Sequence, residues 1–355
     1  MVFGEEGDYD TTGSLRQEAR RGDSAPPKIS QGGLSKRNTE WYDRLILARA
    51  RDLGIKFREV SRYRRAFTNW RDVISSLLRL RQFPLVGYTR MGAKVTLHTG
   101  VHAQVASYAF DPVSRARLPY EEITLTEEGT LVLVPRGDRQ PGPPVRIHGL
   151  LQNGDPTVFL QDEYGGLDVA GRTVLDIGAN IGDSAIYFGI KGASRVIAVE
   201  PFPQTLSIAE FNIQDNHMND RITLVRGSIG GRSGKYYLSD EHGGATGSTI
   251  TCAPNGVLTR EFSLAELTEK FAIREGVLKM DCEGAEYCAI LGASPSALDA
   301  FVQIQLEYHY GPKSLVERLK NLGFTVAYGG PRTFMTKNVK TTPMYVGRLM
   351  AWREL

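Results

Sequence analysis

The chain has 355 residues, enough for one large domain with an attachment or for two domains. Its 43 basic and 40 acidic residues give a formal net charge of +3, which favours no class of partner. Three cysteines without a Cys-x-x-Cys pair exclude a disulfide framework and suit a reducing cytosol. No run approaches eighteen apolar residues, and the polar N-terminus excludes a signal peptide. We therefore expect a soluble, cytoplasmic protein without a membrane span.

The N-terminal part divides by composition into a tail and a helical segment. Residues 1–37 are polar, contain paired prolines and glycines, and show no apolar period, so we expect a disordered tail. Residues 38–84 carry two apolar stripes at helical spacing, over Trp41–Ala48 and Phe67–Leu78. The sequence therefore predicts two amphipathic helices in this segment, which ends at a proline.

These helices are basic, with fifteen Lys or Arg residues against five acids between Lys36 and Lys94. One interpretation is a surface for RNA or for another anionic partner, which would need aromatic rings free to stack beside the arginines. The other is a solvated helix face. Phe67 and Trp70 fall on the apolar stripe, and this favours the second interpretation.

Residues 85–170 are predicted to form a small β-rich layer. Apolar and polar residues alternate over Lys94–Leu97 and Ile123–Val134. Turn residues follow at Gly129 and in the Pro-Gly-Pro-Pro run at 141–144. We expect this layer to lead into the catalytic domain.

Residues 171–355 alternate between strand and helix patterns, which predicts an α/β domain with a mostly parallel sheet and right-handed crossovers. The predicted strands are Thr173–Ile177, Arg195–Val199, Ile222–Val225, Val277–Met280, Val302–Leu306, Phe324–Tyr328 and Met344–Met350. The predicted helices are Gly182–Gly189, Gln204–Asn216, Leu264–Phe271, Glu286–Leu291 and Lys313–Leu322. This order is the Rossmann-like layout of the class I methyltransferase sheet.

The first of these strands runs into a glycine loop that predicts a nucleotide site. Gly178 and Gly182 let the backbone turn and approach a ligand closely. A dinucleotide fingerprint would need glycine where Asn180 stands, and Asp183 in the first helical turn would repel a diphosphate. S-adenosyl-L-methionine has no phosphate and carries two cationic groups. We therefore predict that Asp176, Gly178, Asn180 and Gly182 bind this methyl donor.

Two later strand ends complete the predicted cofactor site. Glu200 follows the second strand, where its carboxylate can accept hydrogen bonds from both ribose hydroxyls; alone, it could equally begin a turn before Pro201. Ser228 follows the third strand and is expected to face the adenine. The small polar loop Glu241–Thr249 is a candidate lid.

A second strong signal is the segment Leu278-Lys-Met-Asp-Cys-Glu-Gly-Ala-Glu286. Asp281 and Glu283 follow a strand on the same edge of the sheet as the glycine loop. Glu286 falls in the first turn of the next helix, where the alternative to a functional role is that it simply caps the helix. Asp281 and Glu283 are therefore predicted to be catalytic, with Asp281 also touching the cofactor.

The ordered set VLDIGANIGD, VIAVEP, REFSLAEL, LKMDCEGAE and IQLEYH resembles the FkbM family of S-adenosylmethionine-dependent methyltransferases. The resemblance covers roughly Arg172 to Gly330, with weaker similarity upstream to about Phe67. It implies O-methylation, often of sugar or natural-product hydroxyls. Cys282 and the aromatic-rich segment Glu307–Tyr310 depart from the family pattern without abolishing a motif.

The general base has several candidates, which are Asp281, Glu283, Glu307 and His309. We predict a catalytic role for His309 because unperturbed histidine titrates near neutral pH, although a strand-end histidine is often structural. Asp281, Glu283 and His309 could share a metal ion, but their spacing does not require one and none is predicted.

We therefore expect a methyltransferase that modifies a hydroxyl group on a glycan or small metabolite. One alternative is an RNA methyltransferase that uses the basic helices. The other is a catalytically silent scaffold that binds S-adenosyl-L-methionine. The sequence predicts neither the acceptor nor the oligomeric state.

Overall fold

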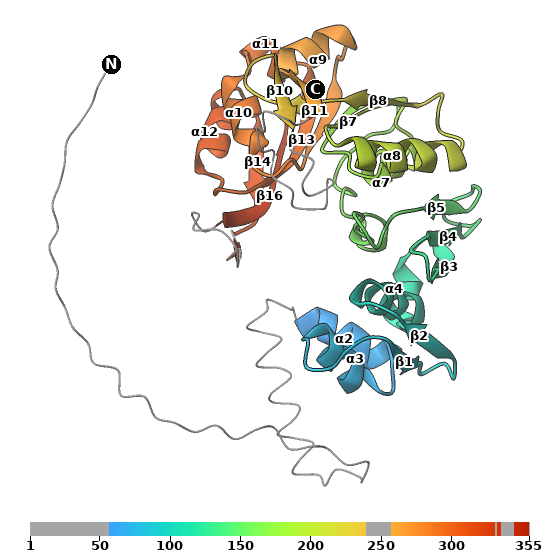
Figure 1. Ribbon diagram of the computed structural model, residues 1–355. Coiled ribbons are helices and arrows are strands. Elements are labelled where there is room, and N and C mark those ends of the chain that lie inside the picture. The colour runs from blue at the N-terminus through green and yellow to red at the C-terminus, as the bar shows by residue number, and fades with distance from the viewer. Residues whose placement is uncertain (1–56, 239–256, 331, 335–343, 355) are drawn as a thin grey trace, which may run out of the picture. The chain divides into compact units, whose positions relative to one another are not determined.

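The computed structural model describes four stretches of the chain, residues 57–238, 257–330, 332–334 and 344–354 (Figure 1). The predicted tail, the predicted helix at Trp41–Ala48 and the loop Glu241–Thr249 lie outside these residues. Within the described stretches, no helix is both long enough and apolar enough to cross a membrane.

The main sheet has the strand order β14-β16-β13-β12-β6-β7-β8, and a further strand, β15, pairs with β16 off this path. Its strands are β6 (Thr173–Ile177), β7 (Arg195–Glu200), β8 (Ile222–Arg226), β12 (Gly276–Met280), β13 (Phe301–Tyr308), β14 (Thr325–Tyr328), β15 (Arg332–Phe334) and β16 (Met344–Trp352). The five strands from β13 to β8 run parallel, whereas β16 is antiparallel to both β13 and β14. This is the class I methyltransferase fold, as the sequence predicted.

Helices cover both faces of this sheet (Figure 1). Their bounds are α7 (Asp183–Ile190), α8 (Pro203–Asp215), α9 (Leu264–Lys270), α10 (Ala285–Gly292), α11 (Pro295–Leu298) and α12 (Lys313–Asn321). Side chains alternate between the two faces, so Val174 of β6 packs in the core with α7 and α8, whereas Leu175 packs in the core with α9 to α12. Burial on both faces explains why these strands appear in the sequence as continuous apolar runs.

The chain leaves β6 toward β7 and β8 on one side, and later enters β12 and β13 on the other. In an open parallel sheet, ligands bind beyond the carboxyl ends of the strands where the direction of winding reverses. This point lies between β6 and β12, and the loops that begin at Gly178 and Asp281 meet there.

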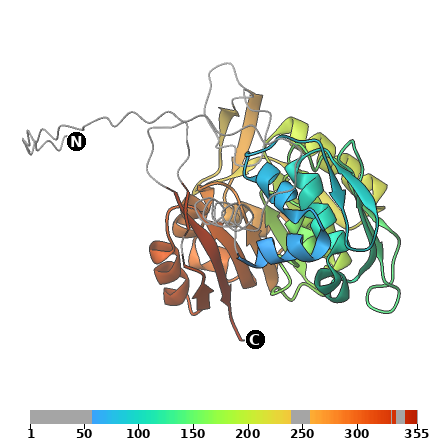
Figure 2. The ribbon, with the colours of Figure 1, turned by 90° about the horizontal axis from the view of Figure 1, so that it is seen from below.

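A small three-stranded sheet, which the sequence did not predict, lies apart from the main one. Its members are β9 (Ser228–Ile229), β10 (Gly234–Leu238) and β11 (Val257–Phe262), in the order β10-β11-β9 (Figure 2, gold). The first strand has two residues, and a long segment separates the other two. The very short first strand and the wide separation of the other two give no continuous pattern from which this sheet could be predicted.

The N-terminal half is a mixed layer rather than a purely β-rich one. Its helices are α2 (Phe57–Ala66), α3 (Trp70–Leu77), α4 (Gly100–Phe110), α5 (Pro112–Arg117) and α6 (Thr157–Leu160). Its strands are β1 (Leu85–Tyr88), β2 (Lys94–Leu97), β3 (Tyr120–Leu125), β4 (Leu131–Pro135) and β5 (Val145–Ile147).

One helix prediction and one prediction of β structure in this half need correction. The apolar pattern over Phe67–Leu78 is not one helix, because Phe67 instead forms a β-bridge with Thr89 and a new helix begins at Trp70. Helix α4 lies where β structure was expected. Most of its surface is buried, so its sequence has no polar face from which helical periodicity could be recognised.

The N-terminal layer is bound to the main domain through helix α8. The backbone N–H of Arg146 donates to Asn216 Oδ1 at 3.0 Å, and that of His148 donates to Asn212 Oδ1 at 2.7 Å. Asn212 Nδ2 also donates to the carbonyl oxygen of Ile181 in the glycine loop at 2.8 Å. These bonds connect the layer directly to the predicted cofactor loop.

Candidate active site

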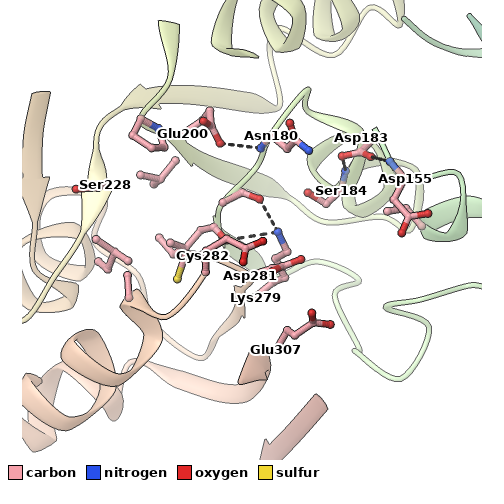
Figure 3. Close-up of a pocket in the computed structure, with 18 of the residues that line it drawn as sticks. Asp155, Asn180, Asp183, Ser184, Glu200, Ser228, Lys279, Asp281, Cys282 and Glu307 are labelled. Carbon is pink, nitrogen blue, oxygen red and sulfur yellow. Dashed lines mark hydrogen bonds between the residues drawn. The ribbon is translucent and has the colours of Figure 1, made fainter. Parts of the chain in front are cut away.

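A cavity of about 260 Å³ lies beyond the carboxyl ends of β6, β7, β12 and β13 (Figure 3). Segments far apart in the sequence form its wall, from the N-terminal layer to β16. The lining residues used below are Asp155, Glu163, Gly178, Asn180, Asp183, Glu200, Phe202, Ser228, Ile229, Lys279, Asp281, Glu283, Glu307 and Arg348. Glu200 and Ser228 lie well apart from Glu307 in this view.

Gly178 occupies the closest approach between the two loops. Its φ of +75° lies in the left-handed region, and a Cβ added there would be 1.9 Å from the carbonyl oxygen of Asp281. The carbonyl oxygen of Gly178 accepts a hydrogen bond from Lys279 Nζ at 2.8 Å. Only glycine fits at this position, because both the backbone conformation and the space exclude a side chain.

Behind the cavity, Asp176 forms a buried ion pair. Its Oδ1 lies 2.9 Å from Lys279 Nζ and its Oδ2 accepts the Ser184 hydroxyl at 2.6 Å. Burial alone would lower the pKa of Lys279, but the carboxylates of Asp176 and Asp281 raise it above its usual value. The lysine is therefore a permanent cation. It connects β12 with β6 through Asp176 and fixes the start of the glycine loop through the carbonyl oxygen of Gly178.

Glu200 ends β7 and is 5% exposed. Its Oε2 and Oε1 accept the backbone N–H groups of Asn180 and Phe202, each at 3.0 Å. Each oxygen keeps a second lone pair for a ligand hydroxyl. Burial raises the pKa of Glu200 to about 7, although the two N–H groups lower it. A ligand that donates hydrogen bonds to this carboxylate favours its ionised form.

Two buried polar atoms at this part of the cavity have no hydrogen-bond partner among the residues that the structure describes. They are the hydroxyl oxygen of Ser228 and the amide oxygen Oδ1 of Asn180. Phe202 and Ile229 line the cavity beside them and add apolar surface. A planar, partly polar group bound here would satisfy atoms that are otherwise costly to bury.

Asp183 begins helix α7 and lines the same cavity. Its Oδ1 accepts the N–H of Ser184 at 2.9 Å, and its Oδ2 accepts that of Asp155 at 3.4 Å. Burial raises the pKa of Asp183 to about 7, although its hydrogen bonds and the charge of Lys279 lower it. A cationic ligand group would return this carboxyl to its ionised form.

Carboxyl groups crowd the far end of the cavity. Burial raises the pKa of Asp281, and the nearby charge of Glu283 raises it further, against the lowering effect of Lys279. Burial, with the charge of Asp281 next, raises the pKa of Glu307 to about 7. This end therefore combines closely spaced acids with three basic side chains, Lys279, His309 and Arg348, whose charges oppose the rise in these pKa values.

His309 is 2% exposed and lies between two carboxylates. Its Nδ1 is 2.9 Å from Glu286 Oε1, and its Nε2 is 3.2 Å from Glu283 Oε2. Burial alone would lower the pKa of His309, but these carboxylates raise it to about 10. The expectation that His309 titrates near neutral pH therefore differs from the structure, because the sequence does not show that both ring nitrogens have acidic partners.

The structure brings together most of the predicted site residues. Of the predicted cofactor residues, those that line the cavity are Gly178, Asn180, Glu200, Ser228 and Asp281. Of the predicted catalytic residues, Asp281 and Glu283 line it as well. Three predicted site residues do not line the cavity, and they contact residues that do: Asp176, Gly182 and His309.

Sequence reasoning missed part of the wall. Asp155 and Glu163 come from the N-terminal layer, and Arg348 comes from β16. No spacing in the sequence connects these residues with the glycine loop. Lys279 did carry a signal, because a lysine within an otherwise apolar strand must find a buried partner.

Part of the chain is similar in sequence to known methyltransferases. Residues 176–326 match the model of the methyltransferase FkbM domain. A 77-residue stretch is 34% identical to the ribosomal protein L11 methyltransferase of Chloroflexus aurantiacus and covers 21% of this chain and 24% of that protein. The corresponding protein of Deinococcus radiodurans is 35% identical over 74 residues, which cover 21% of this chain and 27% of that protein. The chain thus spans about a quarter of the length of these relatives.

Among solved structures, the chain is similar to precorrin-6y C5,15-methyltransferase from Geobacter metallireducens GS-15, with 16% identity and a TM-score of 0.29. That similarity covers 52% of this chain and 82% of the other. The strand order, the glycine loop and the family match all concern the same part of the molecule. Residues 176–326 therefore match the methyltransferase FkbM domain, and they contain the glycine loop and most of the main sheet.

Proposed function

We propose that the protein transfers the methyl group of S-adenosyl-L-methionine to a hydroxyl group of a glycan or small metabolite. The observation that carries this proposal is the cavity itself. Glu200 and two unpaired polar atoms lie toward one part of it, and a group of carboxylates lies toward another, with the glycine loop between them.

The cofactor occupies the part of the cavity nearest the glycine loop. Glu200 accepts the two ribose hydroxyls, and the Ser228 hydroxyl bonds to the adenine. Asp183 attracts the cationic groups of the donor, and the same charge disfavours a dinucleotide, whose pyrophosphate needs a free helix N-terminus. A charge-assisted bond of this kind contributes about 1.5–3 kcal/mol.

Methyl transfer is a displacement in which the acceptor oxygen bonds to the methyl carbon as the carbon–sulfur bond breaks. The electron pair of that bond stays on sulfur, and the hydroxyl proton passes to one of the carboxylates Asp281, Glu283 or Glu307. Holding the two reactants in line can supply about 7–11 kcal/mol of the barrier reduction. General base catalysis typically adds a factor of about 10²–10⁴.

The charge of the cavity supports a neutral or cationic acceptor. Seven carboxyl-bearing side chains line it, against two basic ones, Lys279 and Arg348. Lys279 is engaged by Asp176, and Arg348 pairs with Glu163. A polyanion entering this cavity would meet more acidic than basic groups, whereas polyhydroxyl compounds can donate hydrogen bonds to the carboxyl oxygens.

The alternative, RNA methylation through the basic helices, receives less support from the arginines that the structure describes. The guanidinium of Arg62 stacks 3.8 Å from the centre of the Tyr108 ring, and its Nε donates to Ser107. Arg65 forms two hydrogen bonds to Asp111. These arginines hold α2 against α4 and α5. The rings of Phe67 and Trp70 are buried as well, so they form no stacking platform.

The test is to incubate the full chain with S-adenosyl-L-methionine carrying a labelled methyl group and with panels of glycans, hydroxylated metabolites and RNA. We expect label in a hydroxyl-bearing acceptor. The double variant Asp281→Asn with Glu283→Gln should lose turnover while cofactor binding persists through Glu200 and the glycine loop, whereas Glu269→Gln on the exposed face of α9 should retain both. Transfer to RNA, with affinity that falls steeply with salt, would instead support the alternative.

A further inference from the structure

Three side chains converge at the acidic end of the cavity. Asp281 follows β12, and Glu307 and His309 lie at the end of the neighbouring strand β13. Because Met280 pairs with Leu306 and side chains alternate along a strand, Glu307 and His309 project toward the side of Asp281. One oxygen from each carboxylate and one ring nitrogen of His309 all lie within 4.8 Å of one another.

The second ring nitrogen of His309 is held as it is in metal sites. A histidine that binds a metal usually donates its other ring N–H to a carboxylate, which fixes the ring. Glu286, which is fully buried, does this for Nδ1 at 2.9 Å. It also accepts the backbone N–H groups of His309 and Gly284, at 3.1 and 2.9 Å. Nε2 is therefore aimed at the acids of the cavity, where Glu283 lies 3.2 Å away.

Space for a small ligand is present beside these groups. A separate cavity of about 10 Å³ is lined by Asp281 and Glu307 together with Glu163 and Arg348, whose Nε lies 3.9 Å from Glu307 Oε2. His309 lies next to this cavity's acids but does not line it. A volume of this size corresponds to roughly one water molecule. The two carboxylates and the oriented imidazole supply the ligand atoms that a mononuclear cation site requires, and a single-atom space adjoins the two carboxylates.

We propose that Asp281, Glu307 and the Nε2 atom of His309 bind one divalent first-row metal ion. Carboxylates favour Mg²⁺ and Mn²⁺ and imidazole favours later metals, so a set of two oxygens and one nitrogen matches Mn²⁺ best. The ion takes the place of the proton at Nε2, which then passes to solvent, and Glu283 loses its present partner. The sequence predicted no metal, because nothing in its spacing shows that Glu307 lies beside Asp281.

The role of the ion rests on the proposed function, but its binding does not. Three protein ligands leave coordination positions open for water and for the oxygen of an acceptor. A metal ion in that position lowers the pKa of the bound hydroxyl and fixes its direction of approach to the methyl carbon. This would make the protein a metal-assisted O-methyltransferase.

Direct binding of Mn²⁺ tests the site. The full chain is treated with EDTA, freed of chelator and titrated with Mn²⁺, and free Mn²⁺ is measured by its electron paramagnetic resonance signal. We expect one equivalent bound per chain. Glu307→Gln should abolish stoichiometric binding, and Glu286→Gln should weaken it by roughly 10–100-fold by releasing the imidazole. Glu269→Gln, which changes an exposed acid elsewhere, should bind as the unaltered protein does.

The two proposals fail in different ways. Circular dichroism and cooperative unfolding in urea confirm that each variant is folded, and this control does not depend on the methyl donor. If the unaltered chain takes up no Mn²⁺, or if Glu307→Gln binds it equally well, the metal site is refuted whatever the activity. If Mn²⁺ binds as expected and no acceptor is methylated, the site stands and the proposed function fails.

Discussion

Replacing Gly178 by alanine is the sharpest structural test of the loop geometry. Its φ of +75° costs an alanine about 1–2 kcal/mol. The added Cβ would also lie 1.9 Å from the carbonyl oxygen of Asp281, which is backbone and cannot rotate away. Such overpacking typically costs a further 1–3 kcal/mol or so. We therefore expect Gly178→Ala to lower the free energy of unfolding by about 2–5 kcal/mol.

Gly171 provides the matched control. Its φ is +71°, but a Cβ added there would meet no atom within 4 Å. Gly171→Ala should therefore cost only the conformational part, about 1–2 kcal/mol. Urea unfolding gives both values, and titration with S-adenosyl-L-methionine should show lost affinity for Gly178→Ala alone. Equal destabilisation by the two substitutions, with cofactor affinity retained in both, would refute the close approach of the two loops.

The remaining predictions concern buried charge. Lys279→Met should destabilise the protein by about 3–5 kcal/mol in urea unfolding, because Asp176 would be left buried and unpaired; adding Asp176→Asn should restore most of this. Asp183→Asn should raise the free energy of unfolding at pH 8 by roughly 4 kcal/mol, since burial raises the pKa of Asp183 from 3.8 to about 7. Because the pKa of Asp183 is higher in the folded than in the unfolded state, protonation of this carboxyl favours folding at low pH. That stabilisation is lost as the pH rises from about 4 to 7. The variant and the unaltered protein should therefore have similar free energies of unfolding near pH 4. The same substitution should weaken binding of the cationic cofactor, which calorimetry measures.

The parallel domain was predictable because its strands are buried on both faces. Strands such as Thr173–Ile177 and Arg195–Glu200 are short apolar runs, and each is followed by a helix with an apolar stripe. Because alternating strands and helices give parallel strands, the loops that follow the strands must all lie at the carboxyl-terminal edge of the sheet. This is why Gly178 and Glu200 could be assigned to one cavity from the sequence.

The N-terminal layer was harder to predict because its helices lack a one-sided pattern. Helix α4 is buried on most of its surface, and the turn at Thr68 and Asn69 interrupts an apolar stripe that continues across it. Asn69 is occupied in bonding β1, through Val86 and Tyr88, rather than in capping α3. Tertiary contacts decide the structure at these positions, and a local pattern does not contain them.

The acidic end of the cavity shows a different limit. Asp281 and Glu283 could be found because they follow a strand in a dense motif, but the electrostatics of His309 depend on Glu286 from the helix beside it. Glu163 and Arg348 come from segments that are close only in the folded chain. A pKa depends on such neighbours, so the protonation state of each of these groups could not be predicted from the sequence.

Binding of the methyl donor is the central claim, and calorimetry of the unaltered chain beside Glu200→Ala tests it most directly. We predict stoichiometric binding of S-adenosyl-L-methionine, which Glu200→Ala weakens by about 2–3 kcal/mol through the loss of the ribose hydrogen bonds. NADH should show no binding, because Asp183 opposes its pyrophosphate. Unchanged affinity in Glu200→Ala, or tight binding of NADH, would contradict the account.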